Sequence, residues 1–118
     1  MKIEHIDRLL RTPKYGLPIG LAVETACGDL GIEVQRKNLH EIISLSELIL
    51  LIHKNSSSYG MIYSSKLRIP IGCAVRTASG EIGMEIKRGK DLEVIPIKTL
   101  VSLLVHTVDA AEERRVPA

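Results

Sequence analysis

One long internal repeat dominates this chain. The stretch LPIGLAVETACGDLGIEVQR at residues 17–36 returns, with conservative changes, as IPIGCAVRTASGEIGMEIKR at residues 69–88. When residue i is placed over residue i + 52, fifteen of thirty-eight consecutive pairs are identical and no gap is needed. Self-similarity at a fixed spacing is typical of one supersecondary unit that is used twice. We therefore expect a single domain, 1–118, built from two units, 1–54 and 59–118, with residues 55–58 as a flexible linker.

Each repeat alternates apolar residues with polar or small ones, as a half-buried strand does. In the first copy this alternation covers residues 20–26 and 29–36. The pattern predicts two strands joined by a two-residue hairpin loop at Cys27-Gly28, and the second copy repeats it with a loop at Ser79-Gly80.

The predicted loop also sets which side chains share a face. It places Ala74 opposite Glu85, and Arg76 opposite Gly83. All four are expected on the outward face, and Lys87 is expected to project from that same face. A short helix over this part of the second copy is the rival interpretation, but its glycines, its β-branched residues and the lack of a helical stripe argue against it.

Further strands are predicted on both sides of each hairpin. LHEII at residues 39–43 and DLEVI at residues 91–95 follow the hairpins after turn signals. Upstream, KIEHIDRLL at residues 2–10 and MIYSSKLRI at residues 61–69 are predicted fourth strands, although the first could also form a short helix.

A helix is predicted at the end of each unit. Ser44 and Glu47 form a capping-box pattern, and an apolar stripe follows them. The second helix is expected from about Ile97 toward Arg115. The apolar stripe of the second helix is wide enough to pack against its own sheet and a neighbouring helix, either that of the other copy or that of a second subunit. The expected fold class is α+β, with two pseudo-symmetric βββα or ββββα units packed through their helices.

Charge is distributed unevenly between the two copies. The chain has 16 Lys and Arg against 14 Asp and Glu, a net charge of +2. Residues 1–58 hold seven basic and seven acidic side chains, whereas residues 59–118 hold nine basic and seven acidic ones. The whole basic excess therefore lies in the second copy, which makes that copy the expected binding surface.

Several classes of function find little support in the sequence. There is no apolar run of the roughly 18–20 residues that span a bilayer, and the amino terminus lacks a signal-peptide pattern, so a cytoplasmic protein is expected. Cys27 and Cys73 belong to no CxxC pair, so we expect reduced cysteines and no metal site. The histidines lack a consistent serine or carboxylate partner, and no phosphate-binding loop is present. We therefore expect no cofactor, no catalytic residues and no enzymatic activity.

The second copy also resembles a known family. It contains Val75-Arg76, Gly80, IGMEIK at residues 82–87, and a strand that ends in IPI at residues 95–97 before a helix. This run is similar to the single-stranded-DNA-binding domain of the eukaryotic transcriptional positive cofactor four family, whose unit has four antiparallel strands and a helix. The plant Whirly proteins are similar in carrying two such units in one polypeptide. The resemblance implies outward-facing sheets with helices packed between them, and binding of single-stranded or melted nucleic acid along the exposed sheet.

Basic side chains neutralise phosphates, and aromatic rings stack on the bases of single strands. The residues predicted to bind nucleic acid are Arg76, Lys87, Arg88, Lys90, Lys66, Arg68 and Tyr63 in the second copy, with Arg36, Lys37 and Lys14 as a weaker set in the first. The expected function is a small, non-enzymatic protein that binds single-stranded DNA or RNA through backbone contacts along an exposed sheet.

Two other functions remain open at this stage. One is a protein-interaction or oligomerisation module without nucleic-acid binding, and a homo-oligomer, a dimer above all, is expected in either case. The other is a tandem DNA-binding protein of the swapped-hairpin AbrB type, which the run SSKLRIPIG ahead of KRGKDLEVIP resembles. That fold requires a helix near residues 72–79.

Overall fold

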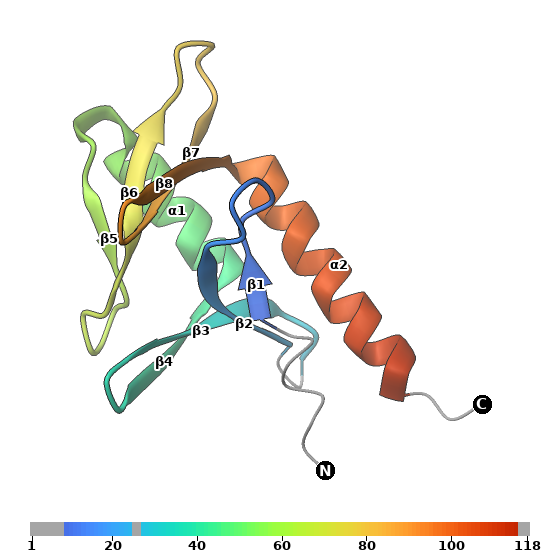
Figure 1. Ribbon diagram of the computed structural model, residues 1–118. Coiled ribbons are helices and arrows are strands. Elements are labelled where there is room, and N and C mark those ends of the chain that lie inside the picture. Colours follow the sequence, from blue (N-terminus) through green and yellow to red (C-terminus); the bar gives the residue numbers. More distant parts are fainter. Residues whose placement is uncertain (1–8, 25–26, 116–118) are drawn as a thin grey trace.

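The chain folds into two similar four-stranded sheets, each followed by a helix (Figure 1). The computed structural model describes residues 9–24 and 27–115, with side chains up to residue 109. The first unit consists of β1 (Leu9–Arg11), β2 (Pro18–Glu24), β3 (Leu30–Arg36), β4 (Leu39–Ser44) and α1 (Leu45–Asn55). The second unit consists of β5 (Met61–Tyr63), β6 (Pro70–Arg76), β7 (Ile82–Arg88), β8 (Asp91–Pro96) and α2 (Ile97–Arg115).

Both sheets are antiparallel meanders, in the orders β1-β2-β3-β4 and β5-β6-β7-β8. The predicted duplication of a ββββα unit is therefore confirmed. The strand predicted upstream of each hairpin, β1 or β5, is only three residues long, and residues 2–8 of the first upstream stretch lie outside the described residues. The rival helix over residues 72–79 is wrong, because Pro70–Arg76 is a strand.

The predicted hairpin register is wrong by one residue. Ala74 pairs with Met84 and both are fully buried. The loop is one residue longer than predicted, because the Thr77 N–H donates to the Glu81 carbonyl at 2.7 Å and the Gly80 N–H donates to the Thr77 carbonyl at 2.9 Å. Gly80 has φ of 91°, a left-handed conformation that suits the last position of a three-residue hairpin loop.

The new register separates two residues predicted to share a face. Arg76 pairs with Ile82, which packs against the core, whereas Lys87 follows the buried Ile86 and shares the outward face with Glu85. Successive residues of a strand point to opposite sides. Arg76 and Lys87 therefore start from opposite faces of the second sheet.

The helices hold the two units together. α1 begins as predicted, with the Ser44 hydroxyl accepting the Glu47 N–H at 3.2 Å. It contacts β3 and β4 of its own sheet and β5, β6 and β7 of the other, while α2 contacts β7 and β8 of its own sheet and β1, β2 and β3 of the other. The helix residues Leu48, Ile52, Leu100 and Leu104 are fully buried in one common cluster. The two units therefore share a single hydrophobic core. Neither described helix is long and apolar enough to cross a membrane.

The predicted flexible connector has regular structure instead. Ser56–Ser58 forms a 3-10 helix directly after α1, and Ser56 is buried. The Gly60 N–H then donates to the Asn55 carbonyl at 3.0 Å. A side chain at Gly60 would collide with that of Asn55, so the chain needs glycine to turn closely around the helix end.

Candidate nucleic-acid interface

A buried glutamate of the second unit binds a turn of the first unit. Glu93 on β8 accepts the backbone N–H groups of Lys14 and Tyr15 at 2.8 and 2.9 Å, one on each carboxylate oxygen. Burial raises the pKa of Glu93, but hydrogen bonds from the Thr12 hydroxyl and from these two N–H groups outweigh it, and the pKa lies below its ordinary value. We call this contact between β8 and the turn at residues 12–17 the second junction.

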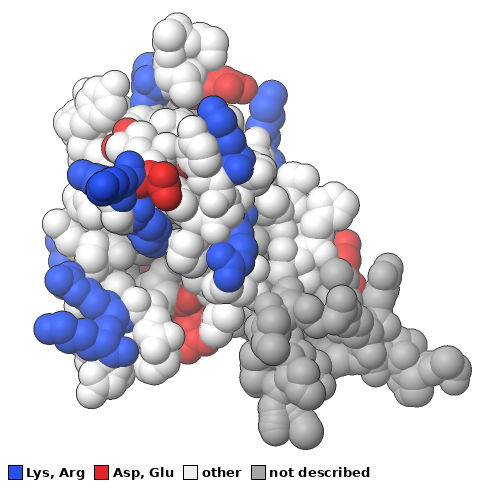
Figure 2. Space-filling model, viewed as in Figure 1, with Lys and Arg blue, Asp and Glu red and all other residues white. Residues whose placement is uncertain are grey.

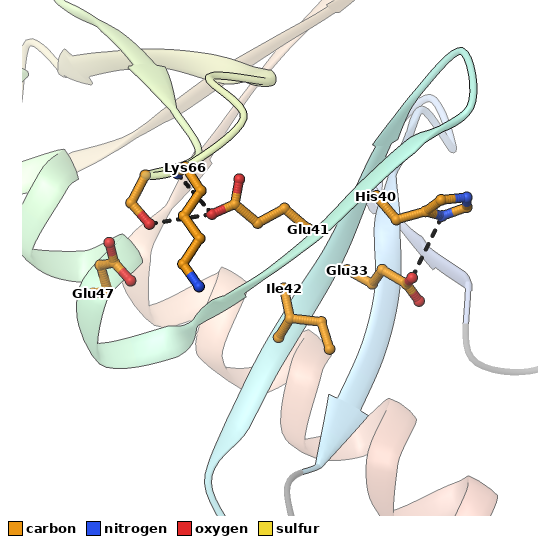
Figure 3. Close-up of a pocket in the computed structure, with 7 residues that line it drawn as sticks. Glu33, His40, Glu41, Ile42, Glu47 and Lys66 are labelled. Carbon is orange, nitrogen blue, oxygen red and sulfur yellow. Dashed lines mark hydrogen bonds and ion pairs between the residues drawn. The ribbon is translucent and has the colours of Figure 1, made fainter.

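The repeat places an equivalent glutamate in the first unit. Glu41 on β4 accepts the backbone N–H group of Lys66 at 2.8 Å (Figure 3). It also accepts the backbone N–H group of Leu67 at 2.8 Å. Hydrogen bonds from the Ser64 hydroxyl and from these two N–H groups lower the pKa of Glu41 to about 2. We call this contact between β4 and the turn at residues 64–69 the first junction. Each unit therefore binds the other through one carboxylate and one turn.

Both turns are held in the same shape by their own side chains. The hydroxyl oxygens of Thr12 and Ser64, both buried, each accept the N–H five residues further along the chain at 2.8 Å. Gly16 and Arg68, at equivalent positions, have φ of 67° and 56°. Two consecutive N–H groups in each turn then point at the carboxylate of the other unit, which is a geometry that suits an anion.

Both units contribute basic residues to the elements that form the second junction. The β7–β8 hairpin carries Lys87, Arg88 and Lys90, and the turn bound by Glu93 carries Lys14. Arg88 lines an open groove of about 310 Å³ together with residues of β1, β2 and β3 in the first unit. The hairpin of one unit and the outward side of the other sheet therefore form one continuous surface.

Five of the predicted residues lie around the first junction. Arg36 and Lys37 stand at the end of the β3–β4 hairpin, which runs past the turn that carries Lys66 and Arg68 (Figure 1). The Arg68 guanidinium lies over the Tyr63 ring, 4.6 Å from its centroid. This pair presents a flat cationic surface of the kind that stacks on bases.

Acidic side chains distinguish the first junction from the second. A pocket of about 510 Å³ beside it is lined by Glu33, His40, Glu41, Ile42, Glu47, Ser65 and Lys66 (Figure 3). His40 Nδ1 lies 3.5 Å from Glu33 Oε2. At the positions equivalent to His40 and Glu47, the second unit has Leu92 and Thr99. Glu33 also lines the groove at the second junction, but it is the one carboxylate among the described lining residues there, against three in this pocket. A negatively charged backbone is therefore repelled less at the second junction.

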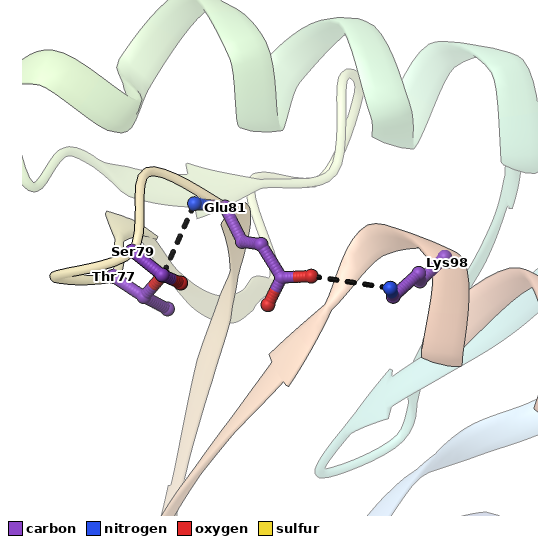
Figure 4. A network of polar contacts seen from close by, with 4 residues as sticks. All are labelled: Thr77, Ser79, Glu81 and Lys98. Atoms are coloured by element: carbon purple, nitrogen blue, oxygen red, sulfur yellow. Dashed lines mark hydrogen bonds and ion pairs between the residues drawn. The ribbon is translucent and has the colours of Figure 1, made fainter.

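Arg76 lies apart from both junctions. It stands opposite Ile82, six residues along β7 from Arg88 and thus about 20 Å away. The loop beside it is tied to α2 by an ion pair of 3.3 Å between Glu81 Oε2 and Lys98 Nζ (Figure 4). The other predicted residues therefore belong to elements at one of the two junctions, whereas Arg76 does not.

The outward face of the second sheet is mixed in character. Glu85 lies in the middle of it near Lys87, and Met61, Leu92 and Val94 are exposed apolar residues on its edge strands. In the view of Figure 2, Lys and Arg form several separate groups, with Asp and Glu beside some of them. The cations follow the hairpin ends and turns, and they do not form a stripe along the sheet.

Lys14, a member of the weaker basic set of the first copy, and Tyr15, which the sequence leaves between the exposed sheet and a strand edge, both lie at the second junction. Lys14 aligns with Lys66 in the repeat, and this was the available signal. Only the structure shows that the backbone N–H of Lys14 is bound by Glu93 of the other unit. Among the described side chains, no group of three or more His, Cys, Asp or Glu could hold a metal ion. Cys27 and Cys73 are both free.

Comparison with known proteins finds no matching family model, no similar curated protein and no similar solved structure.

Proposed function

We propose that the protein binds single-stranded nucleic acid at the second junction and catalyses no reaction. The observation that supports this is Arg88, which reaches from the β7–β8 hairpin of the second unit to an open groove on the first sheet. Lys87 and Lys90 belong to the same hairpin, and Lys14 belongs to the turn that Glu93 binds. Cations placed around a groove release counterions when they neutralise phosphates, and this drives binding that is independent of sequence. A homo-oligomer would present several such grooves.

The groove also offers surfaces for bases. Pro18, Gly20 and Leu21 line it, and their small or apolar side chains leave room for a close approach. Tyr15, in the adjoining turn, is 53% exposed and can stack on an unpaired base. Contacts of this kind favour single strands over a duplex, in which the bases are already stacked. We therefore propose little preference for base sequence.

The test is fluorescence anisotropy with a labelled single-stranded oligonucleotide of mixed sequence across a salt series. We expect the logarithm of the association constant to fall linearly with the logarithm of salt concentration. Lys90→Glu should weaken binding and reduce the slope by about 0.7, the contribution of one phosphate contact on a single strand. Arg76→Glu is the matched control. Like Lys90→Glu it replaces a positive charge with a negative one, but at an exposed position at the far end of the same sheet.

Two results would contradict the proposal. One is the absence of binding at low salt, which would favour the protein-interaction alternative. The other is an Arg76→Glu variant that loses as much affinity as Lys90→Glu, because binding would then depend on net charge and not on the junction.

A further inference from the structure

The solvent side of α1 carries an apolar stripe of which the core uses only a part. Leu50 is 69% exposed, whereas Leu51 beside it is half-buried and packs against the edge of the core. Glu47 and Lys54 lie on the same side, because the four residues follow the i, i+3, i+4, i+7 spacing of one helix face. Together with His53 they line an open pocket of about 630 Å³.

The fold itself does not require this stripe. α2 occupies the equivalent place in the second unit, and its residues at the positions of Glu47 and Leu50 are Thr99 and the exposed Ser102. The pseudo-symmetric scaffold therefore accepts a polar surface here. Leu50 on α1 is an addition to the scaffold, and an exposed leucine with apolar surface around it marks an interaction surface.

The charges at the two ends of the stripe are complementary to each other. Glu47 and Lys54 have opposite signs, and within the part of the chain that the structure describes neither side chain belongs to an ion pair. Their midpoint falls between Leu50 and Leu51. An antiparallel copy of α1 related by a two-fold axis at that point would bring Glu47 of each chain opposite Lys54 of the other. A parallel copy would place like charges together.

We propose that a second copy of this chain docks on α1, with the two helices antiparallel and the leucines at the centre of the contact. A two-fold interface must be complementary to itself, and this stripe meets that condition. Glu47 also lines the pocket that contains Ile42, so this 55% exposed apolar side chain of β4 lies near the Glu47 end of the stripe. A contact of this size is small for a protein interface, and we expect a dimer that dissociates in the micromolar range.

The first test is sedimentation equilibrium of the full chain without nucleic acid, over a wide range of protein concentration. We expect the wild type to change from monomer to dimer. Leu50→Glu should raise the dissociation constant about 30-fold or more, as the loss of a central interface residue does. Ser102→Glu is the matched control at the equivalent position of α2 and should leave the dissociation constant unchanged.

The second test exchanges the charges. Lys54→Glu and Glu47→Lys should each raise the dissociation constant about tenfold at low salt, and the double variant should return it to within about threefold of the wild type. Circular dichroism checks that each variant folds. A wild type that stays monomeric, a dimer that survives Leu50→Glu, or a double variant that is weaker than both single ones would each overturn the proposal. These measurements do not depend on whether the second junction binds nucleic acid.

Discussion

Replacing Glu93 with glutamine tests whether the second junction stabilises the fold. The carboxylate is 7% exposed and accepts two backbone N–H groups at 2.8 and 2.9 Å. Glutamine keeps one acceptor oxygen and turns an NH₂ group toward the second N–H. One charge-assisted hydrogen bond is lost, and such bonds contribute about 1.5–3 kcal/mol each. We expect the free energy of unfolding at pH 7 to fall by about 2 kcal/mol, and the melting temperature to fall by about 8 °C.

Urea denaturation followed by circular dichroism measures this change. Asp91→Asn is the control, because it makes the same chemical change at an exposed position two residues away on β8. It should alter the free energy of unfolding by less than about 0.5 kcal/mol. If Glu93→Gln is no more destabilising than Asp91→Asn, the hydrogen bonds at the junction contribute no net stability and the reasoning is refuted.

The pH dependence of the same pair of proteins gives a second check. The pKa of Glu93 is lowered in the folded protein, so the contribution of its carboxylate is present above the ordinary value of 4.5 and is lost as the pH falls through the folded value. The difference between wild type and Glu93→Gln should therefore shrink in acid. A difference of constant size down to the acid limit would show that it comes from packing and not from the charge.

Two further predictions concern the first junction and the second sheet. Hydrogen bonds from Ser64 and the turn hold the pKa of Glu41 at about 2, so the wild type should lose stability as the pH falls from 4.5 to about 2, and Glu41→Gln should flatten this part of the profile in urea titrations at a series of pH values. Gly83→Ala would press a Cβ against the Ile95 carbonyl oxygen and should lower the free energy of unfolding by about 1–3 kcal/mol. Gly89→Ala meets no atom within 4 Å, so only its φ of +62° should matter, at a cost of about 1 kcal/mol. Equal losses at the two glycines would contradict this reading of the strand contact.

The face on which Arg76 lies shows where sequence reasoning failed. A Ser-Gly pair suits a two-residue loop as well as the end of a three-residue loop. The two possibilities differ by one residue, and one residue moves every side chain of the strand to the other face. The hydrogen bonds between Thr77 and Glu81 stabilise the longer loop, and no local sequence pattern predicts them.

The candidate site was predictable only in part, for a related reason. Arg88 and Lys90 could be placed on a hairpin end from the turn signals around them. Their neighbour Lys14 could not, because it is 79 residues away from Glu93, which holds it in place. A contact of this kind depends on how the units dock, and the sequence offers no local pattern for it.

The amino-acid sequence alone determined the duplicated ββββα unit, the start of α1 at Ser44 and, to within one residue, the hairpin turns. These features depend on the spacing of apolar residues, on glycines and on caps, which act over a few residues. Only the tertiary structure decided that each helix packs against both sheets and that Glu41 and Glu93 join the units in a reciprocal way. The reason is physical: neither unit can bury its apolar helix face alone, and the docking that buries it is set by the shapes of both units together.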